Sequence, residues 1–183
     1  MKIGIIYGQL LKMGLFMDSD RLFHFLHFVC SYNNVRENST EHHFIVDTYN
    51  RIKPLPVGYK VSYTDSWCAV FVSFCFRVFF PDIVFPYECS CERMVKAISV
   101  LGRHRMHIRT HRKGYRMDYE PVPGDVVFYK FTELGAPTHT GIVISVDPEN
   151  VRVIEGNYSN SVGIRQVKKT SQIIYGYFQP FEV

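Results

Sequence analysis

The sequence predicts an α+β domain in which N-terminal helices pack on a C-terminal antiparallel β-sheet. In the first half of the chain, apolar residues recur at the spacing of an amphipathic helix. From about residue 121 onward they follow the pattern of strands, and turn residues separate these segments at short intervals. Because the helices come first and an antiparallel sheet follows them, the order of elements implies an α+β domain.

The first half contains four expected helices: residues 18–32, 41–52, 67–80 and 92–101. The first two have an apolar face, the third is a long apolar run, and the fourth is short. Asp18 and Ser19 precede the first of them as capping residues. Pro54 and Pro81 end the second and the third, because proline has no amide to donate inside a helix. The third helix is the most apolar, and we expect it to pack on the sheet.

The second half contains five expected strands: residues 125–131, 139–146, 151–158, 162–168 and 174–178. Turn signals follow the second strand at Asp147-Pro148 and the third at Ser159-Asn160. The second and third strands are therefore expected to form a hairpin.

Length and composition indicate one globular domain. The chain has 183 residues, of which 46% are hydrophobic and 21% charged. We expect this domain to span residues 18–183 and residues 1–17 to form an extension of uncertain role. The net charge of +4 is too small to select a class of partner. The longest apolar stretch, Trp67–Phe76, is about half the length of a membrane span, so no transmembrane segment is expected.

Cysteine usage indicates a reducing compartment. The five cysteines are odd in number and lack the spacing of a disulfide framework, so at least one thiol is expected to be free.

Cys68 is the candidate nucleophile. Asp65 or Ser66 is suited to cap the third helix, which would place Cys68 in its first turn. There the unpaired amides and the helix dipole lower the pKa of a thiol, and the same amides can donate to a developing oxyanion. The alternative is a buried apolar cysteine, comparable with Cys75 in the same helix.

His139 is the candidate base, and Glu155 and Asn157 are its candidate partners. His139 opens one strand, whereas Glu155 and Asn157 share a face of the next. If His139 pairs with Asn157, Glu155 lies opposite Gly141 and within reach of the imidazole. This register requires an odd-length turn or a bulge near the turn, because a plain two-residue turn would put His139 and Glu155 on opposite faces. Either Glu155 or Asn157 can then orient the ring.

Four blocks around these residues occur in order along the chain: Tyr63–Ala69, Pro123–Tyr129, His139–Val143 and Val153–Ser159. Together they resemble the CHAP family of cysteine, histidine-dependent amidohydrolases/peptidases. The resemblance extends over roughly residues 18–183 and includes segments similar to CHAP-type lysins of phages and prophages of Gram-positive gut bacteria. It implies a papain-like fold.

The resemblance also implies an activity, the hydrolysis of an amide bond in peptidoglycan. The bond would lie in the stem or cross-bridge peptide, or between muramic acid and L-alanine. By the family's pattern Cys68 is the nucleophile, His139 the general base, Glu155 its orienting residue and Asn157 a supporting polar residue. Neighbouring side chains are the expected substrate contacts: Tyr63, Asp65, Trp67 and Tyr158.

No cofactor or metal is needed for this mechanism. We expect a monomer that is made in the bacterial cytoplasm without a signal peptide and acts on the wall after release. Five metal-capable residues lie close in sequence, but their spacing matches no common zinc site: Cys89, Cys91, His104, His107 and His111.

The segment from Leu101 to Met117 is unusually basic. Its candidate polyanion-binding residues are Arg103, Arg105, Arg109, Arg112 and Lys113. They would form a patch for anionic wall polymers, or else an ordinary solvated loop, and the two interpretations have equal support. Few aromatic residues interleave these charges, so a nucleic-acid partner is not expected.

Two alternatives to a peptidoglycan hydrolase stay open at this point. A cysteine peptidase or acyltransferase that acts on protein targets would use the same thiolate. A non-catalytic wall-binding module would need no thiolate at all.

Overall fold

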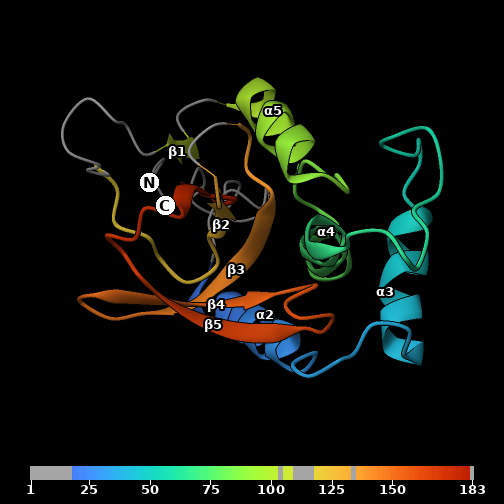
Figure 1. Ribbon diagram of the computed structural model, residues 1–183, viewed down its shortest axis with the longest axis horizontal. Coiled ribbons are helices and arrows are strands. Elements are labelled where there is room, and N and C mark those ends of the chain that lie inside the picture. The colour runs from blue at the N-terminus through green and yellow to red at the C-terminus, as the bar shows by residue number, and fades with distance from the viewer. Residues whose placement is uncertain (1–17, 103–104, 109–117, 133–134, 182–183) are drawn as a thin grey trace, which may run out of the picture.

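The computed structural model describes residues 18–102, 105–108, 118–132 and 135–181 (Figure 1). The described helices are α2 (Ser19–Cys30), α3 (Thr40–Asn50), α4 (Cys68–Phe79) and α5 (Cys91–Leu101). The described strands are β1 (Met106–Ile108), β2 (Val126–Tyr129), β3 (His139–Val146), β4 (Asn150–Glu155), β5 (Gly163–Lys168) and β6 (Ile174–Phe178). The predicted α+β class and the predicted order of helices and strands are confirmed.

Three of the helices begin at polar capping side chains. The carboxylate of Asp18 accepts from the Asp20 amide at 2.7 Å at the start of α2. Ser39 caps α3 and Ser90 caps α5 in the same manner, through their hydroxyl oxygens. Such caps satisfy amides that have no partner within the helix. The fourth helix, α4, has no side-chain cap, and every residue from Cys68 to Phe76 is buried. Burial rather than capping therefore stabilises α4.

The strands form one antiparallel sheet in the order β1-β6-β2-β3-β4-β5. Sequence reasoning missed β1, because three residues are too short to show a strand period. Its backbone pairs with β6, with Met106 opposite Phe178. Two predicted strands are shorter than expected: β2 covers four residues, and β4 ends at Glu155 rather than at residue 158.

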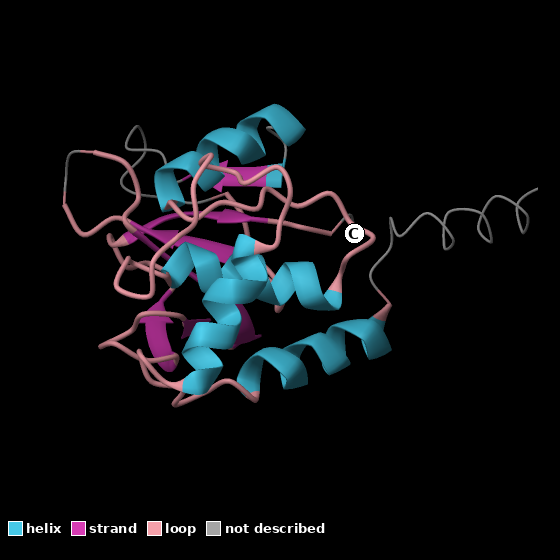
Figure 2. Cartoon of the chain, turned by 90° about the vertical axis from the view of Figure 1, so that its right-hand side faces the viewer, coloured by secondary structure: helices cyan, strands magenta, loops and turns pink. Residues whose placement is uncertain are grey.

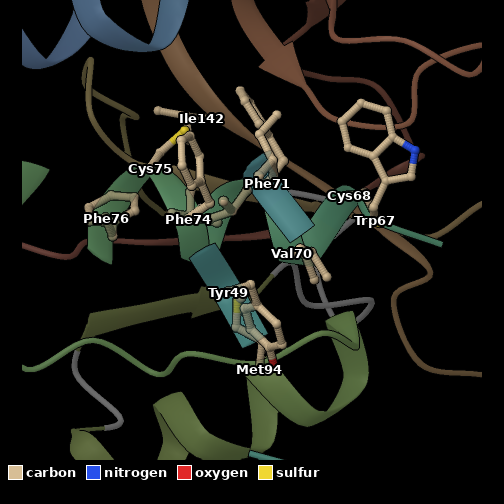
Figure 3. Packing of buried hydrophobic residues seen from close by; sticks show 14 of the residues in the cluster. Tyr49, Trp67, Cys68, Val70, Phe71, Phe74, Cys75, Phe76, Met94 and Ile142 are labelled. Carbon is tan, nitrogen blue, oxygen red and sulfur yellow. The ribbon is translucent and has the colours of Figure 1, made fainter. Parts of the chain in front are cut away.

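The main core lies between the helices and one face of the sheet. Helix α4 contacts β3 and β4, so the prediction that it packs on the sheet is confirmed. Figure 2 shows the helices gathered in front of the strands. Figure 3 follows α4 from Trp67 and Cys68 at one end to Phe76 at the other, with core side chains around it. A second, smaller cluster that includes Val127, Val143 and Tyr177 fills the other face of the sheet. Cys68 is thus held by the most buried helix of the domain.

Candidate active site

Cys68 is the first residue of α4, and its side chain is almost completely buried, with 5% of the residue exposed. The prediction that Asp65 or Ser66 caps this helix is wrong. The N-cap position belongs to Trp67, and the carboxylate of Asp65 instead accepts from the Ser62 amide at 2.8 Å. The helix therefore begins after the turn that Asp65 closes. The predicted placement of Cys68 in the first helical turn is nevertheless confirmed, and the Ala69 amide faces its sulfur.

His139, the first residue of β3, lies between Cys68 and Glu155. Its Nε2 is 2.9 Å from Oε2 of Glu155, and the imidazole also hydrogen bonds to the Cys68 thiol. Because Nε2 faces the carboxylate, Nδ1 is the ring nitrogen left for the sulfur. The ring stacks on Tyr129 with centroids 5.9 Å apart, and Phe131 lies at 6.2 Å. Three groups thus follow one another in the order thiol, imidazole, carboxylate.

Burial lowers the pKa of His139, but its hydrogen bonds to Cys68 and Glu155 outweigh that effect and raise it to about 9. The pKa of Cys68 shifts in the opposite direction. A hydrogen bond from Cys91 lowers it most, burial raises it, and His139 and the Ala69 amide lower it further, so that the net pKa lies well below that of an ordinary thiol. The two shifts together favour a thiolate beside an imidazolium at neutral pH.

The hairpin of β3 and β4 brings His139 and Glu155 onto the same face by combining two features. A plain two-residue turn connects the strands, with the Asp147 amide donating to the Asn150 carbonyl at 3.0 Å. By itself this turn would separate His139 and Glu155, but the register shifts by one residue between Val143 and Ser145. Sequence reasoning expected the irregularity near the turn, and the structure places it within β3.

Gly141 makes room for the Glu155 carboxylate across this hairpin. A Cβ atom at Gly141 would lie 2.7 Å from Cγ of Glu155 and 2.6 Å from Cγ1 of Val153. These distances are shorter than carbon atoms tolerate, so any larger residue would displace Glu155. The predicted position of Glu155 opposite Gly141 agrees with this contact.

Glu155 is fully buried, and Arg165 of β5 is its second partner. Nε of Arg165 is 2.9 Å from Oε1 and 3.1 Å from Oε2 of the carboxylate. The guanidinium carbon also lies 4.5 Å from the centre of the Tyr158 ring, at cation–π distance. A buried carboxylate requires such compensation, because desolvation alone would favour its neutral form.

Asn157 does not take the position that the sequence suggested. Strand β4 ends at Glu155, and Asn157 adopts a left-handed backbone with φ of 57° in the turn that follows. Asparagine is one of the few residues that tolerate this conformation. Nε2–H of His139 donates to the carboxylate of Glu155, so of the two candidates Glu155 is the one with a hydrogen bond to the ring.

Cys91 is a site residue that sequence reasoning missed. It is the first residue of α5, and its sulfur lies 3.7 Å from that of Cys68. The pKa of Cys91 is raised well above that of an ordinary thiol, and the hydrogen bond to the Cys68 sulfur is the main cause. Cys91 belongs to the buried core and packs on Cys68 there, whereas Cys89 is half-buried against the same core. Only the packing of α5 beside α4 reveals the pair.

Arg165 is the other site residue that sequence reasoning missed. Its pairing with Glu155 could have been predicted if the register between β4 and β5 had been known. Arg165 pairs with Val153, two residues before Glu155, so the two charged side chains are diagonal neighbours on one face. The sequence did not fix the register between these strands.

The four predicted substrate contacts occupy different environments. Trp67 is fully buried, and its Nε1–H donates to Glu37 at 3.0 Å. Because none of its surface is exposed, it packs beside Cys68 and cannot contact a substrate directly. Tyr63 is half-buried, stacks on His43 at 3.9 Å and donates to Asp47. Asp65 is exposed in the turn before α4. The fourth, Tyr158, is half-buried, and its ring packs on the guanidinium of Arg165.

The basic segment is only partly described. Arg105 is half-buried, and its carbonyl accepts from the Gln179 amide at 2.9 Å. The other predicted patch residues lie outside the described residues: Arg103, Arg109, Arg112 and Lys113. Two of the metal-capable histidines, His104 and His111, also lie outside them. The patch therefore stays a prediction.

Comparison with known proteins identifies the family. The model of the CHAP domain matches residues 58–157, which is more than half of the chain and includes Cys68, His139 and Glu155. The chain belongs to the CHAP family. No curated protein matches it. Among solved structures, the crystal structure of Ly7917 superposes with a TM-score of 0.52 at 14% identity and covers 88% of this chain. The present chain spans 62% of the Ly7917 chain, and the likeness concerns the fold.

CHAP domains are amidases or peptidases, and their usual substrate is peptidoglycan. The fold described above agrees with this family, since helices precede a six-stranded antiparallel sheet. In the part of the chain that the structure describes, no helix is long and apolar enough to span a membrane.

Proposed function

We propose that this CHAP domain hydrolyses an amide bond of peptidoglycan with Cys68 as the nucleophile. The observation that carries the proposal is the continuous series from the Cys68 thiol through His139 to the buried Glu155 carboxylate. A thiol, a base and an orienting acid in this order form the arrangement of cysteine hydrolases.

The reaction begins with a thiolate that is already formed. Cys68 attacks the carbonyl carbon of the scissile amide, and the backbone amide of Cys68 at the start of α4 donates to the developing oxyanion. The imidazolium of His139 then gives its proton to the leaving amine, which leaves an acyl group on Cys68. Neutral His139 next takes a proton from water, and the resulting hydroxide releases the acid product.

Glu155 and Arg165 act as positioning residues in this mechanism. Because Oε2 of Glu155 accepts from Nε2–H of His139, the carboxylate fixes the ring so that Nδ1 faces the sulfur. Arg165 holds both oxygens of that carboxylate and compensates its charge in a fully buried position. Neither residue needs to touch the substrate.

The finer assignment is an endolysin-like enzyme that cuts the stem or cross-bridge peptide or the muramoyl-L-alanine linkage. Its support is the sequence resemblance to lysins of phages and prophages of Gram-positive bacteria. One hollow in the described surface, which is lined by none of Cys68, His139 and Glu155, contains Glu37, the partner of Trp67, and the turn that follows Tyr158. It is lined by Arg36, Glu37, Asn38, Ser159, Asn160 and Ser161.

The test is the loss of turbidity of purified Gram-positive sacculi with wild type, Cys68→Ala and Cys30→Ser. Cys30 is a half-buried cysteine at the end of α2, which makes it a matched control. Wild type and Cys30→Ser are expected to clear the suspension, and Cys68→Ala is expected not to. Mass spectrometry of the released fragments then identifies the bond.

Three results would contradict the proposal. If Cys68→Ala clears sacculi as fast as wild type, Cys68 is not the nucleophile. If no protein clears sacculi while a thiol-directed activity probe labels Cys68, a peptidase or acyltransferase acting on proteins takes the place of the wall hydrolase. Equal binding of wild type and Cys68→Ala to sacculi, without cleavage by either protein, would indicate a binding module.

A further inference from the structure

Two thiols meet at the candidate active site, and only one of them, Cys68, is the proposed nucleophile. Cys68 begins α4 and Cys91 begins α5, and the two sulfurs lie 3.7 Å apart. Each residue is 5% exposed. The remaining cysteines are placed differently: Cys75 is completely buried in the core, while Cys30 and Cys89 are half-buried.

Their separation is close to what a disulfide requires. Two bonded sulfurs lie about 2.05 Å apart, so the pair must approach by roughly 1.7 Å. Rotation of the two side chains about χ1, with a small shift of the helix ends, can provide a movement of this size. Both thiols are free in the structure, which therefore represents the reduced state.

We propose that Cys68 and Cys91 form a redox modification site, in which a peroxide oxidises Cys68 and Cys91 resolves the product to a disulfide. In the first step the Cys68 thiolate attacks one peroxide oxygen, the O–O bond breaks, and Cys68 becomes a sulfenic acid while hydroxide leaves. In the second step the Cys91 sulfur attacks the Cys68 sulfur, the S–O bond breaks and hydroxide leaves with the Cys91 proton as water. Two electrons pass from the two thiols to one peroxide.

The electrostatics of the pair suits this order of events. Cys68 has the lower pKa of the two and is the thiolate that meets the oxidant. The pKa of Cys91 is high mainly because its thiol donates to Cys68. Once Cys68 becomes a neutral sulfenic acid this effect disappears, so Cys91 ionises more readily just when it is needed as a nucleophile.

The consequence is a reversible block of the enzyme. A disulfide removes the nucleophile from catalysis and also protects it from oxidation to sulfinic acid, which is irreversible for most proteins. A dithiol reductant restores both thiols by exchange. This consequence for activity rests on the proposed function, whereas the formation of the disulfide does not.

The experiment compares the full-length wild type with Cys91→Ala, Cys91→Ser and Cys89→Ser. Cys89 lies two residues before Cys91 and has no place in the proposed mechanism, so it is the matched control. Each protein is treated with hydrogen peroxide, alkylated, digested and analysed by mass spectrometry for a Cys68–Cys91 cross-link. Lysis of sacculi is measured before treatment, after treatment and after addition of dithiothreitol. Circular dichroism before treatment establishes that each variant is folded.

Wild type and Cys89→Ser are expected to show the Cys68–Cys91 cross-link, to lose about tenfold or more of their lytic rate and to recover it with dithiothreitol. The Cys91 variants are expected to accumulate sulfinic acid at Cys68 and to recover several-fold less. The proposal is overturned if wild type forms sulfinic acid at Cys68 without a cross-link, or if Cys91 bonds to Cys89 instead. If reduced wild type does not lyse sacculi, the proposed function fails, but the cross-link still decides this inference.

Discussion

Replacing Glu155 by glutamine is the sharpest test of how the site is organised. The change removes one charge and almost no volume from a fully buried position. Because Arg165 can only donate, the glutamine oxygen is expected to face Arg165 and its NH₂ group to face Nε2 of His139. The imidazole would then carry its proton on Nδ1, toward Cys68, and could no longer accept one there.

The structure also sets the size of the effect. The pKa of His139 rises from 6.5 to about 9, and the difference corresponds to about 3 kcal/mol in favour of the imidazolium. Cys68 and Glu155 both contribute, so the loss of the carboxylate removes a part of it, about 1.4–3 kcal/mol. We therefore expect lysis at neutral pH to be about 10- to 100-fold slower in Glu155→Gln.

The assay combines the initial rate of sacculus lysis with the rate of Cys68 alkylation by iodoacetamide, each followed across pH. In wild type, alkylation should begin well below the pKa of a free thiol, and lysis should decline as His139 loses its proton near pH 9. In Glu155→Gln this decline should move at least about one unit lower. Glu41→Gln on α3 is the control for the charge change. A lytic rate within about twofold of wild type with an unmoved basic limb would refute the reasoning.

Three further outcomes are expected. Arg165→Gln should slow lysis about tenfold or more, because it leaves the buried Glu155 carboxylate without its ion-pair partner, whereas Arg165→Lys should recover part of the rate. Equal pH profiles of lysis for wild type and both variants would exclude a positioning role. Gly156→Ala should lower the free energy of unfolding, measured by urea titration, by about 2 kcal/mol or more, because the added Cβ would lie 2.4 Å from Cβ of Phe71. An unchanged urea midpoint would contradict this close contact between Gly156 and Phe71. Burial raises the pKa of Asp125 to about 6, so the contribution of its protonated carboxyl to stability decreases as pH rises from about 4 to 6. The Tm of Asp125→Asn should lack this decrease. Parallel curves of Tm against pH for wild type and variant would contradict the raised pKa.

The helices could be predicted from local sequence, because their determinants are local. Asp18 and Pro54 bound the first two helices, and the apolar run after Trp67 could only be a buried third one. The strand β1 could not be predicted in this way. Its hydrogen bonds come from β6, far away in the sequence, and three residues leave no periodic pattern to detect.

The individual residues of the candidate site were predicted from the sequence, but the contacts between them were not. The sequence indicated Cys68, His139 and Glu155 by residue type and by position at the ends of elements. It left Glu155 and Asn157 as alternatives, because two residues on one strand face are equivalent until the strand end is known. The turn at Asn157, with its positive φ, distinguishes them.

By itself the sequence determined the fold class, the order of elements and the family motifs, since periodicity, capping residues and prolines act over a few neighbouring residues. Only the tertiary structure decided that the β3 register shift aligns His139 with Glu155, that Arg165 compensates the buried carboxylate and that Cys91 meets Cys68. These contacts join elements far apart in the chain. Their geometry depends on strand register and helix packing, where a displacement of one residue moves a side chain to the opposite face.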